Sequence, residues 1–307
     1  MKRNAIRLAG LAAACLISGA AFAQSSSGVL RDGFDGSDFA ADGGLYYRDN
    51  FEQSAGACAF QSEIKRSGTG ALKLSVKPIT PVADFNHSER AEVWEKTGLR
   101  VPYGVGVWYG FAVKFADPIP NDSHRYVIAQ WKREIDPGAD GNFSPFLAIR
   151  LQNGKLYATI ETNYIAPGRD DASSANALPT FFRPHANQMR VLVATDPTWT
   201  PADANLFAGF TTAVSVIDHG NALPQPGSGW IDFAIYAKPG PDGSGHIEII
   251  ANGKPIVTVK GPIGHADKGL GKTQYFKFGP YRAGHTNEWT LYYDYFRRSP
   301  FRGDVVR

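Results

Sequence analysis

Hydrophobic and polar residues alternate along most of the chain, in short runs that end at Gly, Pro, Asn or Asp. A period of two places successive side chains on opposite faces of a strand, whereas an amphipathic helix needs a period near 3.6. The pattern therefore predicts a dozen strands, over residues 71–76, 90–95, 107–115, 125–134, 145–151, 155–162, 189–195, 230–237, 246–251, 255–260, 275–281 and 289–298.

Two turns support this interpretation. Asn153-Gly154 and Asn252-Gly253 each join two alternating runs, which is the strongest short-range signal for a β-hairpin. Many strands with almost no helical pattern predict an all-β sandwich or barrel. The stretches 164–187 and 196–229 are rich in turn residues and are expected to be loops, either at the rim of a binding site or as plain surface.

The N-terminus has the features of a secretory signal peptide. Lys2, Arg3 and Arg7 precede an apolar stretch over residues 8–22, and Ala21-Phe22-Ala23 offers a cleavage site. We therefore expect residues 1–23 to be removed, residues 24–307 to form a single domain, and the protein to be exported to the periplasm or the medium. A lipoprotein signal at Cys15 fits less well, because apolar residues continue past it.

Charge and cysteine content narrow the function classes. The chain has 32 Lys plus Arg and 29 Asp plus Glu, and three of the basic residues belong to the leader, so the mature chain is formally neutral. We expect no nucleic-acid or membrane partner, and a monomer. Cys58 would be the one remaining cysteine and is expected to be a small buried residue. No zinc pattern is present, so neither a catalytic metal nor a cofactor is expected; Asp32, Asp35 and Asp294 fit either a structural calcium site or ordinary turns.

Three predicted strands combine a polar, partly cationic face with a mostly apolar one. The polar sets are Tyr275, Lys277, Gly279 and Tyr281; Arg90, Glu92 and Trp94; and Ile128, Gln130, Lys132 and Glu134. In a sandwich the apolar faces fill the core, so the polar sets form either solvated surface or the floor of a groove. Gly279 and Pro280 interrupt their strand, which indicates a bulge or the close approach of a ligand.

At these residues the chain resembles the jelly-roll polysaccharide lyases. It has RAEVW at 90–94, QWK at 130–132 and YFKFGPYR at 275–282, in the order in which alginate lyases have R-T/S-E-L-R, Q-I-H and Y-F-K-A-G-x-Y. FKFG followed by Tyr-Arg is more similar to the heparin lyase I-like and glucuronan lyases. The resemblance spans most of the mature chain and implies a concanavalin-like β-sandwich jelly roll with a concave substrate groove.

The resemblance also implies roles for single residues. Tyr281 matches the catalytic tyrosine, which would act as base and acid in a β-elimination, and Arg90 and Gln130 match the pair that holds the uronate carboxyl group. Lys277 matches a substrate-binding lysine, and Lys132 stands where alginate and heparin lyases have histidine. We expect Lys132 to help neutralise the carboxylate. The remaining expected substrate contacts are Tyr275, Glu92, Trp94 and Arg282, and His87 or His124 are the candidates for an imidazole from elsewhere.

The expected substrate is an acidic polysaccharide, either glucuronan-like or another polyuronate or glycosaminoglycan. Two alternatives remain open. A jelly-roll glycoside hydrolase needs two carboxylates, for which Glu134 and Asp136 are the candidates. A non-catalytic, lectin-like sandwich would use aromatic residues such as Trp94, Trp131 and Tyr109. The choice of polyuronate, and endo against exo cutting, stay undecided by the sequence.

Overall fold

The computed structural model describes residues 29–48, 54–79, 84–139, 145–162, 181–185, 188–207, 213–266 and 269–307. The expected signal peptide lies outside this part of the chain, as do residues 164–180 and 186–187 of the first expected loop and residues 208–212 of the second. The described residues form strands and short 3-10 helices, without an α-helix. None of their helices is long and apolar enough to cross a membrane.

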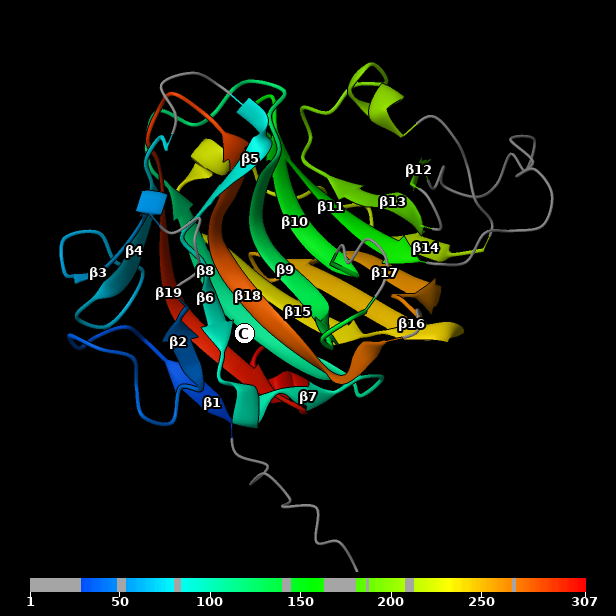
Figure 1. Ribbon diagram of the computed structural model, residues 1–307, viewed down its shortest axis with the longest axis horizontal. Coiled ribbons are helices and arrows are strands. Elements are labelled where there is room, and N and C mark those ends of the chain that lie inside the picture. Colours follow the sequence, from blue (N-terminus) through cyan, green and yellow to red (C-terminus); the bar gives the residue numbers. More distant parts are fainter. Residues whose placement is uncertain are drawn as a thin grey trace, which may run out of the picture.

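The strands form two antiparallel sheets that pack face to face, which confirms the expected all-β sandwich (Figure 1). The first sheet has the order β14-β17-β16-β15-β8-β19-β4-β3, with β1 paired to β19. Its strands are β1 (Leu30–Asp32), β3 (Gly56–Gln61), β4 (Ala71–Val76), β8 (Val107–Phe115), β14 (Ser215–Asp218), β15 (Ile231–Lys238), β16 (Gly240–Ala251), β17 (Lys254–Ile263) and β19 (Trp289–Ser299).

The second sheet, which carries the candidate site, has the order β12-β13-β11-β10-β9-β18-β6-β2, with β5 and β7 also paired to β18. Its strands are β2 (Leu45–Tyr47), β5 (Asp84–Arg90), β6 (Val93–Glu95), β7 (Val101–Pro102), β9 (Tyr126–Ile135), β10 (Leu147–Gln152), β11 (Lys155–Thr162), β12 (Phe181–His185), β13 (Gln188–Thr195) and β18 (Leu270–Gly284). The 3-10 helices are η2 (Thr97–Leu99), η3 (Asp203–Leu206), η4 (Pro226–Ser228) and η5 (Arg302–Asp304).

Aromatic side chains fill the space between the sheets. Phe276 and Phe278 of β18 are fully buried, as their alternation with polar residues predicts. The Phe276 ring centroid lies 4.6 Å from that of Trp131, and the Phe278 centroid lies 4.6 Å from that of Tyr293. This packing fixes the inner face of β18, so its other face is turned away from the core.

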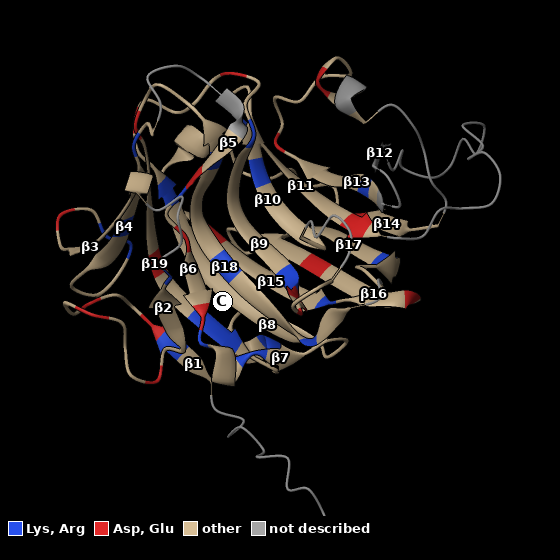
Figure 2. Cartoon of the chain, viewed as in Figure 1, with Lys and Arg blue, Asp and Glu red and all other residues tan. Residues whose placement is uncertain are grey.

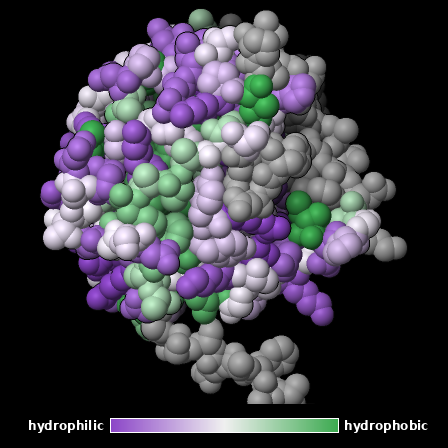
Figure 3. All heavy atoms as spheres, turned by 60° about the vertical axis from the view of Figure 1, so that its left-hand side comes forward, coloured by the Kyte–Doolittle hydropathy of each residue, from purple (hydrophilic) through white to green (hydrophobic). Residues whose placement is uncertain are grey.

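On the side turned forward in Figure 3, hydrophobic patches are interspersed among hydrophilic residues.

Both predicted hairpin turns are present. Asn153 and Gly154 have φ values of 49° and 72°, and Asn252 and Gly253 have values of 49° and 73°. A positive φ at both central residues defines the type I′ turn, whose twist matches that of the flanking strands. These turns join β10 to β11 and β16 to β17.

Three strand predictions were wrong in detail. Residues 90–95 do not form one strand, because β5 ends at Arg90 and β6 begins at Val93. The stretches expected to be loops contain β12 and β14, which are short strands at the sheet edges and lack a full alternating run. Ile128 lies in the core and not on the polar face, because a bulge opposite Ile149 and Arg150 turns both Ile128 and Ala129 inward.

A second bulge lies in β18 at Gly279-Pro280. Phe278 pairs with Ala129 and Tyr281 pairs with Val127, so β18 has one residue more than β9 between these pairs. The backbone N–H of Ala91 donates to the Pro280 carbonyl oxygen over 2.9 Å, in the gap between β5 and β6. The bulge therefore explains both the strand break at Ala91 and the interruption seen in the sequence.

Replacing Gly279 with Ala is expected to destabilise the fold. Gly279 has a φ of 127°, and a Cβ atom there would lie 2.1 Å from the Ala91 carbonyl oxygen. The backbone conformation alone should cost about 1–3 kcal/mol, and the clash adds to it. Urea unfolding should show a lower midpoint than for wild type, whereas Gly98→Ala, at an open position with nothing within 4 Å, should not. Equal midpoints for the two variants would contradict this account of the bulge.

Candidate active site

The three motifs found in the sequence lie side by side in the second sheet. β18 is central, with β9 on one side and β5, β6 and β7 on the other. Lys277 is opposite Gln130 of β9 and Trp94 of β6, and Tyr281 is opposite Arg90 of β5. Lys and Arg positions recur on this sheet, as the blue bands on β10 and β18 show (Figure 2).

Tyr281 lies among cationic side chains. The Arg90 guanidinium carbon is 4.2 Å from the centroid of the Tyr281 ring, and that of Arg125 is 4.8 Å from it. Lys277 Nζ is 6.0 Å from the same centroid. The Tyr281 hydroxyl lies 3.4 Å from the Ser88 hydroxyl, and the residue remains partly exposed. A ligand can therefore reach a phenol that lies among cationic side chains.

Glu92 connects the polar residues of three strands. Its Oε2 atom is 2.7 Å from Lys277 Nζ and 3.7 Å from a terminal nitrogen of Arg90. The Gln130 side-chain amide donates a short hydrogen bond to Oε1. Glu92 and Lys277 are only 1% and 2% exposed, so this ion pair is almost fully removed from water. The arrangement suits Glu92 for positioning the other three side chains.

Lys132 differs from the other cations of the site. Its ammonium group makes no hydrogen bond or ion pair with any residue that the structure describes, although the side chain is half-buried. Burial, reinforced by the positive charge of Lys277, lowers the pKa of Lys132 to about 7. Lys132 therefore changes its charge near neutral pH.

Trp94 and Tyr275 form an aromatic stack beside Lys277. Their ring centroids are 5.4 Å apart with an interplanar angle of 20°. Arg48 and Lys277 lie over the Trp94 ring at 4.2 and 4.4 Å, and Arg100 lies over the Tyr275 ring at 4.5 Å. Burial raises the pKa of Tyr275 well above its ordinary value, so its phenol stays protonated. Of Tyr275 and Tyr281, Tyr281 is thus the better candidate for a base.

Arg282 does not lie where a substrate contact was expected. Its Nε atom is 2.6 Å from Glu89 Oε2, and the two side chains are 1% and 0% exposed. Because this pair is buried, we assign Arg282 to anchoring β5 on β18 and leave it out of the proposed site.

Most of the residues considered for a glycoside hydrolase or a lectin-like surface form other contacts or lie in the core. Glu134 accepts a hydrogen bond from Thr273 and forms an ion pair with Arg100, both over 2.6 Å. Trp131 and Tyr109 are each 1% exposed and lie in the core, so neither can stack on a sugar. Only Trp94 of the three aromatic residues proposed for a lectin-like surface lies on the polar face.

Several charged residues of this face were missed by sequence reasoning. Arg190 Nε is 2.6 Å from Glu161 Oε1, and Arg150 lies 3.8 Å from the same oxygen. Burial lowers the pKa of Arg150 to about 10, and Arg190 contributes. These three residues come from β10, β11 and β13 and extend the charged face beyond β9. Alternation alone predicts that they face the same way, but only strand register shows that they meet.

Two minor expectations can be placed in the structure. The three carboxylates for which a calcium site and ordinary turns were both left open accept backbone N–H bonds: Asp32 from Phe34 and Ala40, Asp35 from Thr69 and Gly70, and Asp294 from Arg66 and Ser67. Cys58 is half-buried rather than fully buried, and burial raises its pKa to about 11, so it is an inert thiol.

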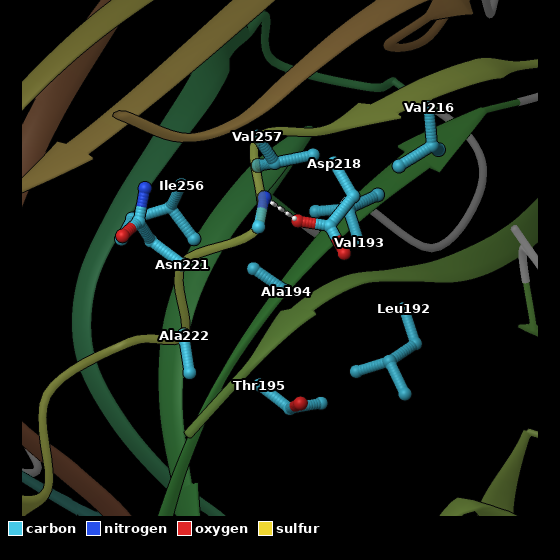
Figure 4. Close-up of a pocket in the computed structure, with 11 residues that line it drawn as sticks. Leu192, Val193, Ala194, Thr195, Val216, Asp218, Asn221, Ala222, Ile256 and Val257 are labelled. Atoms are coloured by element: carbon cyan, nitrogen blue, oxygen red, sulfur yellow. Dashed lines mark hydrogen bonds between the residues drawn. The ribbon is translucent and has the colours of Figure 1, made fainter. Parts of the chain in front are cut away.

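A cavity of about 400 Å³ lies away from the polar face, beside β13, β14 and β17 (Figure 4). Aliphatic side chains such as Leu192, Val216 and Val257 line much of it. Its polar groups include Asp218, whose carboxylate accepts the backbone N–H of Gly220 over 2.7 Å. The cavity lacks the cationic groups and accessible phenol of the β18 site, so the β18 site is the stronger candidate for chemistry on an acidic sugar.

The fold is a β-sandwich, and one of its outer faces is cationic and contains the partly exposed Tyr281. Residues 40–297 match the family model described as polysaccharide lyase. The chain belongs to the polysaccharide lyase family, and it is an enzyme of that class. No curated protein sequence matches it significantly.

The solved structures to which the chain is similar have low sequence identity. An endo-β-1,4-glucuronan lyase from the fungus Trichoderma reesei superposes with a TM-score of 0.55 at 19% identity, covering 91% of this chain and 97% of its own. The cellulose-induced protein Cip1 gives a TM-score of 0.47 at 16% identity, covering 89% and 97%. The alginate lyase Aly36B gives 0.42 at 14% identity, covering 88% and 96%. The first of these supports the jelly-roll fold.

Proposed function

We propose that this polysaccharide lyase cleaves a uronic-acid-containing polysaccharide by β-elimination, with Tyr281 as the residue that moves the proton. The observation that carries the proposal is the position of Tyr281: a partly exposed phenol with Arg90 and Arg125 against its ring. A glucuronan-like chain is the first candidate substrate, because FKFG followed by Tyr-Arg resembles glucuronan lyases and a glucuronan lyase shares the fold.

The first requirement of the reaction is to neutralise the uronate carboxyl group. Removing the C5 proton places a second negative charge beside that carboxylate, so aimed donors are needed. Arg90 and Lys132 are partly exposed and would supply them directly, while Lys277 and Gln130, which are buried and held by Glu92, would add positive charge and polarity close to the same position. The three cations Arg90, Lys132 and Lys277 outnumber the one buried carboxylate of Glu92. The site therefore has a net positive charge, which favours binding of an acidic sugar.

The second requirement is a base and an acid. In the proposed reaction the Tyr281 phenolate takes the C5 proton, and the electrons of the C5–H bond form the C4–C5 double bond. The C4–O4 bond breaks, and the leaving oxygen receives a proton from Tyr281. One residue can serve both steps when the C5 hydrogen and the O4 atom lie on the same side of the sugar ring.

A panel of polyuronates tests the proposal. The unsaturated uronate made by elimination absorbs in the ultraviolet, so absorbance should rise with glucuronan, alginate, hyaluronan or a heparin-like chain, and glucuronan is expected to react fastest. Binding without any rise in absorbance, across a panel that includes a substrate turned over by a known lyase, would overturn the proposal in favour of a lectin-like role.

The charge of Lys132 should make substrate binding depend on pH. Because the Lys132 ammonium loses its proton as pH rises through about 7, affinity for a polyuronate oligosaccharide should fall above that pH. The association constant should fall by up to about tenfold per pH unit, which is the steepest dependence that a single proton linked to binding can give. Calorimetry on the Tyr281→Phe background separates binding from turnover. Adding Lys132→Arg, whose side chain stays charged, should make the affinity nearly independent of pH. If the affinity depends on pH equally steeply with Lys and with Arg, Lys132 is not the titrating group.

We also propose that the mature chain acts outside the cytoplasm as a monomer. The N-terminal pattern of residues 1–23 supports export, and a polymeric substrate is met in the periplasm or the medium. Mass spectrometry of the secreted chain should show cleavage after Ala23, and light scattering should give the mass of one chain. An intact N-terminus in the cytosolic fraction would contradict export.

A further inference from the structure

We propose that Asp122, His124 and His285 form a binding site for one divalent transition-metal ion of the zinc type. Asp122 and His124 lie in the connection between β8 and β9, and His285 follows directly after β18. The two histidines are far apart in sequence, so no short metal-binding pattern marks them. The site is separate from the carboxylate-binding residues and does not depend on the proposed function.

The three side chains converge from two loops. His124 Nδ1 lies 2.9 Å from Asp122 Oδ1, and His285 Nε2 lies 3.3 Å from Asp122 Oδ2. The candidate ligand atoms all lie within 4.8 Å of one another, and the two imidazole centroids are 4.7 Å apart at an angle of 80°. Ligands about 2.0–2.2 Å from a tetrahedral zinc ion lie roughly 3.4 Å from each other, so the more widely separated ligand atoms would have to move closer together when an ion binds.

The donor set selects the kind of metal. Two imidazole nitrogens and one carboxylate suit zinc and its neighbours in the first transition row, whereas calcium and magnesium prefer oxygen ligands throughout. The side chains of His124 and His285 are 12% and 14% exposed, and that of Asp122 is 34% exposed. The cluster is thus sheltered but open on one side, where water can complete the coordination.

The carboxylate of the cluster is already oriented by its neighbours. The Tyr126 hydroxyl donates to Asp122 Oδ2 over 3.0 Å, and the backbone N–H of His124 donates to Oδ1 over 2.9 Å. Tyr126 is buried, with its ring centroid 5.0 Å from that of Trp289. Outer-shell contacts of this kind fix ligand geometry in metal sites and contribute to affinity.

The cluster adjoins the candidate active site through Arg125. This residue follows His124, its carbonyl oxygen accepts the Ala283 N–H over 3.1 Å, and its guanidinium carbon lies 4.8 Å from the Tyr281 ring centroid. A metal ion bound by His124 and His285 would therefore link the β8–β9 connection, which includes Arg125, to the residue that follows β18.

The test is a zinc titration of chelator-treated, tag-free protein in competition with a chromophoric chelator. Wild type should bind one equivalent of Zn²⁺ and melt at a higher temperature when it is loaded. His285→Ala should lower the affinity at least tenfold and abolish the rise in melting temperature. His246→Ala is the matched control, because His246 pairs with Glu248 over 3.2 Å on the other sheet; it should bind as wild type does.

Cobalt provides a second readout. Co²⁺ bound by wild type should show the intense visible absorption of a tetrahedral site, and His124→Gln should lose it, which keeps the proposal testable if His285→Ala does not fold. Equal Zn²⁺ affinity in wild type and His285→Ala, or no stoichiometric binding at all, would overturn the proposal and leave a hydrogen-bonded Asp-His cluster without metal.

Discussion

Tyr281→Phe should lower kcat on the preferred polyuronate by about 10²–10⁴-fold while leaving the fold intact, because it removes one oxygen and the proton transfer that depends on it. The ring, with its contacts to Arg90 and Arg125, would remain in place. The hydroxyl makes one long contact of 3.4 Å with Ser88, so little stability should be lost. Initial rates measured by ultraviolet absorbance, with thermal melts on the same preparations, check both parts.

The matched variant for this prediction is Tyr275→Phe. Tyr275 lies on the same strand and the same face, but its pKa is raised by burial, so it should not serve as a base. We expect its substitution to slow the reaction far less than that of Tyr281. Near-normal turnover by folded Tyr281→Phe would contradict the assignment, and an equal loss in both variants would point to binding rather than proton transfer.

Glu92→Gln should destabilise the protein by about 3–5 kcal/mol, the usual result of removing one partner from a buried ion pair. Lys277 is 2% exposed and has its ammonium 2.7 Å from Glu92, so the substitution leaves a buried cation close to Arg90 and Lys132. Urea denaturation monitored by fluorescence gives the free energy of unfolding. Activity should fall as well, because Gln130 and Lys277 lose the group that positions them.

Two control variants test whether the loss of the Glu92 charge causes the destabilisation. Glu288→Gln changes an exposed carboxylate and should alter stability by less than about 0.5 kcal/mol. Adding Lys277→Met to Glu92→Gln removes the unpaired cation and should recover part of the lost stability. A double variant that is destabilised by the full sum of the single effects would contradict the ion-pair account.

The sequence predicted the strands of this protein better than it predicted the contacts between them. Alternation identified the inward Phe276 and Phe278 and the outward Lys277, because residues 275–278 of β18 precede the bulge and follow a strict period of two. Alternation wrongly placed Ile128 on the polar face. A bulge adds one residue to β9 there, so the alternation between the two faces shifts by one position. Bulges depend on the partner strand, which a local pattern does not contain.

The same limit applies to the site. The resemblance implied that Arg90, Gln130 and Tyr281 belong to one site, and only the strand register shows that their strands are neighbours, with Arg90 opposite Tyr281 and Gln130 opposite Lys277. The burial of Glu92 between Lys277 and Gln130 was not predictable, nor was the approach of Arg125 to Tyr281. Arg125 reaches the ring from the start of β9, and its contact exists only because β9 and β18 pair at that register.

The most direct test of the central claim is mass spectrometry of the products formed from glucuronan. Elimination at C5 by Tyr281 breaks the C4–O4 bond without adding water, so each new non-reducing end should be unsaturated and lighter by one water molecule than that of a hydrolysis product. Products whose new non-reducing ends are all saturated would show hydrolysis and contradict the account.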